Sequence, residues 1–293
     1  MNYELIVIPR LTRNPLKKEY IICLLLFFIA CNSNKKQATA FLENARKLYE
    51  QGEYASAKNN LDSIKKLFPK EFGIQKQGLL LKRRIEIKEQ ERNLSFCDSL
   101  LTLRLAEAET LKTGFLFEKD SAYDDVGKYI DKSQRVEAKL QSSYIRTIVN
   151  ESGEIQLSGV YYGNRPILPS RLKVSKSNGE YAETLDIPYD GGLNYSFVDE
   201  GMTTEVVTYT KGKDNGVIQF IYNNKESVLQ AELIGKGKYT FTVSAADKNV
   251  LAKTFDFAVV LSDIDTLKKE KEKASQRLMY LEGKLTGESS VDE

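Results

Sequence analysis

The stretch that decides the fold is residues 244–285, SAADKNVLAKTFDFAVVLSDIDTLKKEKEKASQRLMYLEGKL. Apolar residues recur in it at alternating steps of three and four, and Lys271 is the one polar residue on this stripe. The stripe consists of Phe257, Val260, Ile264, Leu267, Ala274, Leu278, Leu281 and Leu285. This spacing predicts a single helix about 60 Å long. Because its apolar seam is narrow, another helix must cover it.

Both ends of this helix carry sequence signals. Ser244 stands three residues before Asp247, which is typical of a residue that caps a helix N-terminus. Gly287 follows the last residue of the stripe and predicts the end of the helix. We expect residues 288–293 to form a disordered tail.

A second long helix is predicted over Phe72–Lys112. Its seam repeats every seven residues through Leu80, Ile87, Leu94, Leu101 and Ala108. Because the two helices match in length and flank the rest of the chain, we expect them to pair antiparallel as a coiled-coil stalk. The same heptads would support an oligomer, but we favour a monomer. Cys97 lies on the seam and is expected to act as a small buried hydrophobe.

Residues 38–69 predict a helical hairpin with its turn at Gly52-Glu53-Tyr54. The residues that carry its pattern are Phe41, Ala45, Gly52, Tyr54, Ala57, Leu61 and Pro69. In their types and spacing they resemble the tetratricopeptide repeat. That resemblance implies a helix-turn-helix unit in a family whose concave face binds peptides. One repeat builds no groove, so we favour simple packing on the neighbouring helix over a peptide site.

The middle of the chain changes to strand-like alternation. The predicted strands are residues 144–149, 155–162, 171–176, 181–187, 195–198, 205–210, 217–222, 228–234 and 239–243, with residues 127–131 as an added edge strand. Short glycine-containing turns join them, and no crossover helix separates them, so we expect an antiparallel sandwich or open barrel. The predicted fold class is therefore α+β. Its predicted parts are 38–114 (hairpin and long helix), 115–243 (β-rich domain) and 244–287 (heptad helix).

Composition removes several classes of function. The chain has 43 basic and 41 acidic residues, of which four basic and two acidic lie in residues 1–30. The remainder carries 39 of each, so no electrostatic case for nucleic-acid binding exists. The 293 residues include no histidine, which removes the commonest general base and zinc ligand. We therefore expect no enzymatic activity and no cofactor.

The N-terminus carries a pattern typical of a targeting signal. Arg13, Lys17 and Lys18 precede a ten-residue apolar run, too short to span a bilayer but typical of a signal peptide. The run ends in Phe28-Ile29-Ala30-Cys31, which resembles the lipobox of bacterial lipoproteins. That resemblance implies cleavage between Ala30 and Cys31, lipid attachment at Cys31, and a signal peptide of residues 1–30. Residues 31–37 are then a polar tether, and the chain is anchored in the bacterial cell envelope facing the periplasm.

Other candidate sites have competing readings. Tyrosines at 144, 161, 162, 181, 189, 195, 209, 222 and 239 suit either strand packing or a sugar-stacking platform, and we favour packing. Two acidic clusters, one of Glu118, Asp120, Asp124 and Asp125 and one of Asp186 and Asp190, lack the ligand spacing of a calcium loop. We therefore assign no metal ligands.

Three hypotheses of function remain. The leading one is a membrane-anchored, non-enzymatic envelope lipoprotein that serves as a protein-interaction or scaffold module, with an unidentified protein partner. The alternative is an extracytoplasmic glycan- or ligand-binding protein that uses the tyrosine-rich domain, and outward-facing clustered tyrosines would favour it. The third is an enzyme that uses carboxylates alone, which would need two of them facing each other across a cleft.

Overall fold

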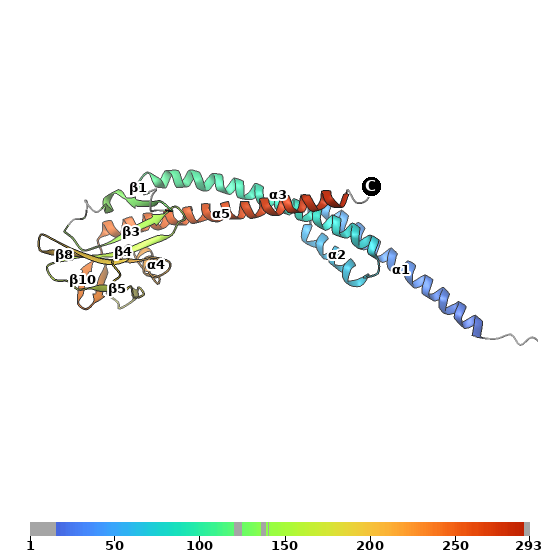
Figure 1. The fold of residues 1–293 in the computed structure, drawn as a ribbon, viewed down its shortest axis with the longest axis horizontal. Coiled ribbons are helices and arrows are strands. Elements are labelled where there is room, and N and C mark those ends of the chain that lie inside the picture. Colours follow the sequence, from blue (N-terminus) through green and yellow to red (C-terminus); the bar gives the residue numbers. More distant parts are fainter. Residues whose placement is uncertain (1–15, 120–124, 136–138, 140, 290–293) are drawn as a thin grey trace, which may run out of the picture. The chain divides into compact units, whose positions relative to one another are not determined.

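The structure is a computed structural model that describes residues 16–119, 125–135, 139 and 141–289, with side chains between residues 33 and 287 of these ranges. It is an α+β protein with two antiparallel sheets, so the predicted fold class is confirmed at this level (Figure 1). The chain forms two compact units, Met1–Leu94 with Ala274–Glu293, and Ser95–Lys273. Both long helices contribute to each unit.

The helices are α1 (Leu16–Glu50), α2 (Tyr54–Leu67), α3 (Phe72–Lys112), α4 (Val217–Asn223) and α5 (Ala245–Ser289), with a 3₁₀ turn η1 (Lys132–Gln134). The predicted hairpin is confirmed, because α2 folds back along α1 after a turn at Gly52 (Figure 1). Its core contains Ala38, Leu42, Ala45, Ala57, Leu61, Ile64, Phe68, Ile74, Leu81 and Ile85. These residues come from α1, α2 and the start of α3, so the hairpin is stabilised by a third helix.

The predicted tether is different in the structure. Residues 31–37 belong to α1, which runs without interruption to Glu50. The segment contains neither Gly nor Pro, so no residue breaks the helix before the hairpin begins. The predicted polar tether is therefore part of a helix in the structure.

The strands are β1 (Phe115–Glu118), β2 (Lys128–Asp131), β3 (Tyr144–Asn150), β4 (Ile155–Gly163), β5 (Pro169–Lys176), β6 (Tyr181–Glu183), β7 (Asn194–Asp199), β8 (Met202–Tyr209), β9 (Leu229–Gly235) and β10 (Lys238–Thr242). Six form a sheet in the order β1-β2-β3-β4-β8-β7, and four form a sheet in the order β10-β9-β5-β6. All strand pairs are antiparallel. Most predicted strands are confirmed within a few residues, and β1 was missed.

One core joins both sheets in this unit. Leu157 and Val207 enter it from the six-stranded sheet, and Leu172 and Leu233 enter it from the four-stranded sheet. Leu251 of α5 lies in the same cluster. The alternation along each strand therefore places one face of each sheet in this core.

The predicted strand over residues 217–222 is wrong, because this segment is helix α4. Val217, Ile218 and Ile221 are its buried residues, and this spacing fits one face of a helix. The preceding turn starts the helix, since Val217 N–H donates to the Asp214 carbonyl. A short apolar run of this kind is ambiguous in sequence.

The organising helix α5 is confirmed together with its cap. The Asp247 N–H donates to Ser244 Oγ at 3.0 Å. The predicted stop at Gly287 is wrong, because α5 continues to Ser289. Of the stripe, Phe257, Val260, Ile264, Leu267, Ala274 and Leu281 are buried.

Salt bridges join helices α3 and α5 within each compact unit. In the β-rich unit Arg104 contacts Asp263 at 3.0 Å, and Lys271 contacts Asp98. The order of these pairs along the two helices shows that α3 and α5 run antiparallel there. In the helical unit Arg277 pairs with Glu86 at 2.7 Å. Lys271, the polar exception on the seam, is thus matched by a carboxylate.

Candidate functional site

The outer face of the six-stranded sheet carries a row of apolar and aromatic side chains. Tyr144 of β3 lies opposite Val160 of β4, which lies opposite Val206 of β8, which lies opposite Tyr195 of β7. The three residues other than Tyr195 are buried, and Tyr195 packs against them. Their neighbours in sequence, such as Ile145 and Val207, point to the opposite face and enter the main core.

A second row beside the first completes a concave surface. Tyr162 lies opposite Thr204, and Thr204 lies opposite Phe197. Together the rows surround a pocket of about 220 Å³, which we call the tyrosine hollow. Its lining residues are Lys139, Gln141, Ser142, Tyr144, Arg146, Val160, Tyr162, Tyr195, Phe197, Asp199, Glu200, Met202, Thr204 and Val206. The Phe197 side chain is 50% exposed, so an aromatic ring remains open to a ligand.

Arg146 supplies the hollow with a cation. It is half-buried, and its buried Nε has no hydrogen-bond partner among the described residues. Burial raises the pKa of the neighbouring Tyr144, the Arg146 guanidinium opposes this shift, and Asp247 and Tyr195 add to it. The Tyr144 phenol therefore stays protonated at neutral pH. The hollow thus offers aromatic rings, a guanidinium and a phenol.

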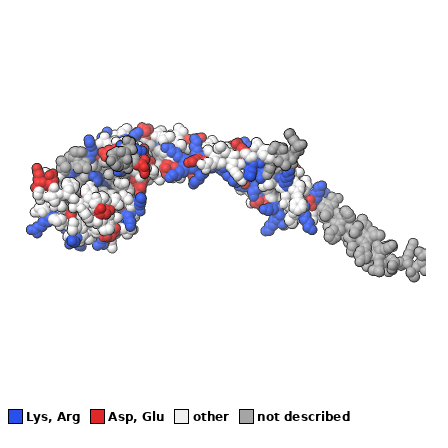
Figure 2. All heavy atoms as spheres, in the orientation of Figure 1, with Lys and Arg blue, Asp and Glu red and all other residues white. Residues whose placement is uncertain are grey.

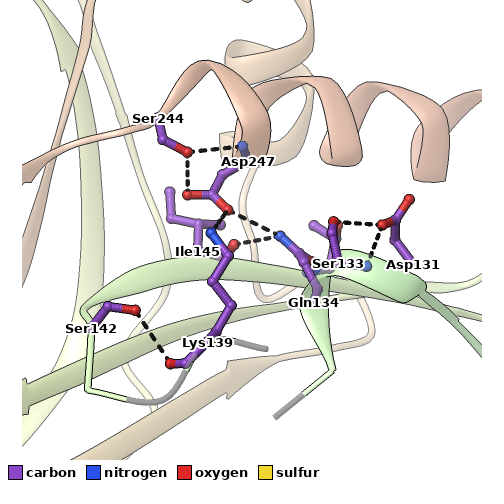
Figure 3. Close-up of polar contacts among 9 residues, drawn as sticks. Asp131, Ser133, Gln134, Lys139, Ser142, Ile145, Ser244 and Asp247 are labelled. Atoms are coloured by element: carbon purple, nitrogen blue, oxygen red, sulfur yellow. Dashed lines mark hydrogen bonds and ion pairs between the residues drawn. The ribbon is translucent and has the colours of Figure 1, made fainter. Parts of the chain in front are cut away.

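A polar network, shown in Figure 3, adjoins the hollow through Lys139, which is one of its lining residues. Lys139 lies with its Nζ 5.3 Å from the centre of the Tyr144 ring and donates to Asp247 Oδ1 at 2.8 Å. Asp247 is only 5% exposed, and its second oxygen accepts from Ser244 Oγ at 2.6 Å. The carboxylate that helps to cap α5 therefore also fixes the lysine at the edge of the hollow.

Gln134 connects this network to strand β3. Its Nε2 donates to the Ile145 carbonyl at 2.9 Å, and its Oε1 accepts from the Thr147 N–H at 2.9 Å. The same Nε2 lies 3.5 Å from Asp247 Oδ1, as Figure 3 shows. Because Gln134 is fully buried with both ends of its amide bonded, it fixes the η1 segment along β3.

The remaining tyrosines do not join the hollow. Tyr161 and Tyr209 point into the core between the sheets. Tyr239 packs its ring on Tyr161, Tyr222 donates to Asp256, and Tyr181 lies under Lys173. Tyr189 is exposed outside the hollow. The expected strand packing therefore holds for many tyrosines, while three of them share the hollow.

The acidic clusters have structural partners. Asp190 Oδ1 accepts from the N–H groups of Gly192 and Asn194 at 2.9 Å each, and these bonds hold its pKa below the usual range. Asp186 accepts from Ser170. Asp120 and Asp124 lie outside the described residues, and Glu118 and Asp125 are exposed. Within the described part, no three acidic or cysteine side chains gather as a metal site would require.

The proposed lipid-attachment residue cannot be placed by its side chain. Ala30 and Cys31 lie in α1, and their side chains are outside the described part. Within that part of the chain, no helix has the length and apolar character needed to span a bilayer. Cys97 is buried and forms no disulfide in the described part of the chain, in agreement with its predicted position on the seam.

The chain matches no protein-family model, no curated protein and no solved structure.

Sequence reasoning named the tyrosines of the hollow but missed Arg146, Lys139 and Phe197. The alternation of β3 places Arg146 on the same face as Tyr144, which was a usable signal. Lys139 lies in an irregular segment, and no sequence pattern connects it with Asp247.

Proposed function

We propose that this chain is a lipid-anchored, non-enzymatic envelope protein whose β-rich unit binds a ligand in the tyrosine hollow. The observation that carries this proposal is the outward cluster of Tyr144, Tyr162, Tyr195 and Phe197 around one pocket. A surface that served only strand packing would not need an open aromatic ring on the same pocket lining as a guanidinium that lacks a partner at Nε. The hollow suits a ligand with both apolar and polar groups, since it is concave and lined by aromatic and aliphatic side chains together with charged and polar ones.

The ligand class that suits the hollow is a saccharide. Aromatic rings stack on the apolar faces of sugars. Arg146 can donate to hydroxyl or acidic substituents, and Asp199 and Glu200 can accept from hydroxyl groups. The volume of about 220 Å³ is below that of sites for drug-sized molecules, so it suits one ring of a longer chain.

The test is calorimetric titration of the purified chain with neutral and acidic oligosaccharides. We expect Phe197→Ala to weaken binding about tenfold, because loss of a stacked ring costs about 1 kcal/mol or more. Tyr189→Ala is the control, since Tyr189 is also an exposed aromatic residue and lies outside the hollow. If no saccharide binds, or if Phe197→Ala binds as tightly as the unmodified chain, the hollow is not a glycan site.

A second candidate function is a scaffold for an envelope protein. It is supported by Phe96 and Leu103, which lie seven residues apart on α3 and are 63% and 66% exposed. Such residues form an apolar stripe on a helix whose opposite side pairs with α5. In this proposal α3 and α5 form a coiled-coil stalk within one chain, and the two sheets form a sandwich.

The anchor has a test of its own. Cys31→Ser is expected to abolish incorporation of labelled fatty acid and to move the chain from the membrane fraction to the soluble fraction. Cys23→Ser is the control, because Cys23 lies in the same apolar run and does not follow Ala30. If the Cys31 variant still incorporates the label, the lipid attachment is elsewhere.

A further inference from the structure

We propose that the turn between α2 and α3 contacts the anionic surface of the membrane that carries the anchor, an inference that rests on the proposed lipid attachment at Cys31. The turn exposes two large apolar side chains. Phe72 is 76% exposed, more than any other large hydrophobic residue among those described, and Leu67 is 57% exposed. Both side chains would bury apolar surface away from water in the headgroup layer of a bilayer.

Lysines surround these two residues. Lys65 and Lys66 end α2, and Lys70 lies within the turn, where Glu71 is the one acidic residue. The three lysines are exposed, and no carboxylate pairs with them in the described part of the chain. Apolar side chains flanked by lysines are typical of segments that lie at an anionic membrane surface.

The charge of the surrounding helices agrees with this pattern. Residues 33–94 contain 14 basic and 8 acidic residues, although the chain beyond residue 30 is neutral. In Figure 2 blue side chains dominate the surface around α2. Each basic residue close to an anionic membrane contributes about 1 kcal/mol of attraction.

The fold brings this turn to the end of the hairpin that faces the anchor. Because α2 returns along α1, the end of α2 lies near the start of the hairpin, and the rings of Phe68 and Phe41 are 5.9 Å apart. Ten residues of continuous helix separate Phe41 from Cys31, which is about 15 Å. If α1 inclines towards the bilayer, this distance allows the turn to reach the headgroup layer.

The membrane is favoured over a protein as the occupant of this surface. An anchor holds the turn at a high local concentration of lipid, so weak apolar and electrostatic contacts suffice. Basic residues beside a lipid anchor add an electrostatic contact with anionic lipids. The turn would supply such a contact.

The test uses the absence of tryptophan from the chain. The lipidated full chain with Phe72→Trp is reconstituted in phosphatidylcholine vesicles that contain phosphatidylglycerol, with brominated acyl chains as quencher. We expect at least about twofold quenching of this tryptophan, since it inserts beside the acyl chains. Gln51→Trp, in the exposed turn at the opposite end of the hairpin, is the control and should not be quenched.

Three results decide the inference. Changing Lys65, Lys66 and Lys70 to Glu in the Phe72→Trp chain should reduce quenching to the level of the control. If the chain floats with the vesicles but the tryptophan at 72 is no more quenched than that at 51, the turn does not contact the membrane and only this inference fails. If the lipid-labelled chain does not float with the vesicles, the anchor itself fails, and the inference that rests on it fails with it.

Discussion

Gly153→Ala is expected to destabilise the β-rich unit by about 2–5 kcal/mol, because two penalties coincide at this residue. Gly153 ends the turn between β3 and β4 with a φ of +82°, a conformation that costs other residues about 1 kcal/mol or more. A Cβ there would lie 2.4 Å from the Ala258 carbonyl oxygen and 2.5 Å from the Ser262 nitrogen. These are backbone atoms of α5, so the turn or the helix must move.

Gly179→Ala is the matched control. Gly179 also ends a hairpin turn, its φ is +90°, and no atom lies within 4 Å of a Cβ built there. Gly179→Ala should lower the free energy of unfolding only by the backbone penalty of about 1 kcal/mol. Urea unfolding followed by near-ultraviolet circular dichroism of the tyrosines measures both. If both variants lose the same amount of unfolding free energy, the β3–β4 turn does not press against α5.

The sequence predicts the turn at Gly153 but not its contact with the helix. Glu151-Ser152-Gly153 is a local signal, because the residues that favour a turn lie next to one another in the sequence. The contact joins residues more than 100 positions apart. No local pattern encodes it, because it depends on how α5 crosses the sheet.

The long helices, like the turn at Gly153, were predictable because their signals lie in neighbouring residues. The heptad stripe of α5 and the helical spacing in α1 and α2 repeat over several turns, so the signal accumulates. Helix α4 has only seven residues, and its apolar run fits a strand equally well. Its type is decided by the turn that precedes it and by the core that it enters.

The tyrosine hollow could not be predicted without knowing the register of the strands. Tyr144 and Tyr195 meet because β3, β4, β8 and β7 align them through Val160 and Val206. A slip of one residue in any strand would send one of these side chains to the opposite face. The sequence therefore predicts candidate tyrosines, whereas only the fold selects those that share a pocket.

Asp247→Ala is expected to cost about 3–5 kcal/mol, because it removes one partner of a buried ion pair. The Asp247 carboxylate accepts from Lys139 at 2.8 Å and from Ser244 at 2.6 Å, and its loss leaves the lysine beside Tyr144 without a counter-charge. The edge of the tyrosine hollow should loosen as a result. Ligand binding should then weaken together with stability.

The control for this prediction is Asp265→Ala on the same helix. Asp265 accepts from Lys269 at 2.6 Å, but the lysine side chain is 65% exposed, so the pair should contribute at most about 1 kcal/mol. The double variant Asp247→Ala/Lys139→Ala should be less destabilised than the sum of its single variants, because it leaves no buried charge unpaired. Urea unfolding of the four chains measures this coupling. If Asp247→Ala costs no more than Asp265→Ala, the buried network does not stabilise α5 against the sheet.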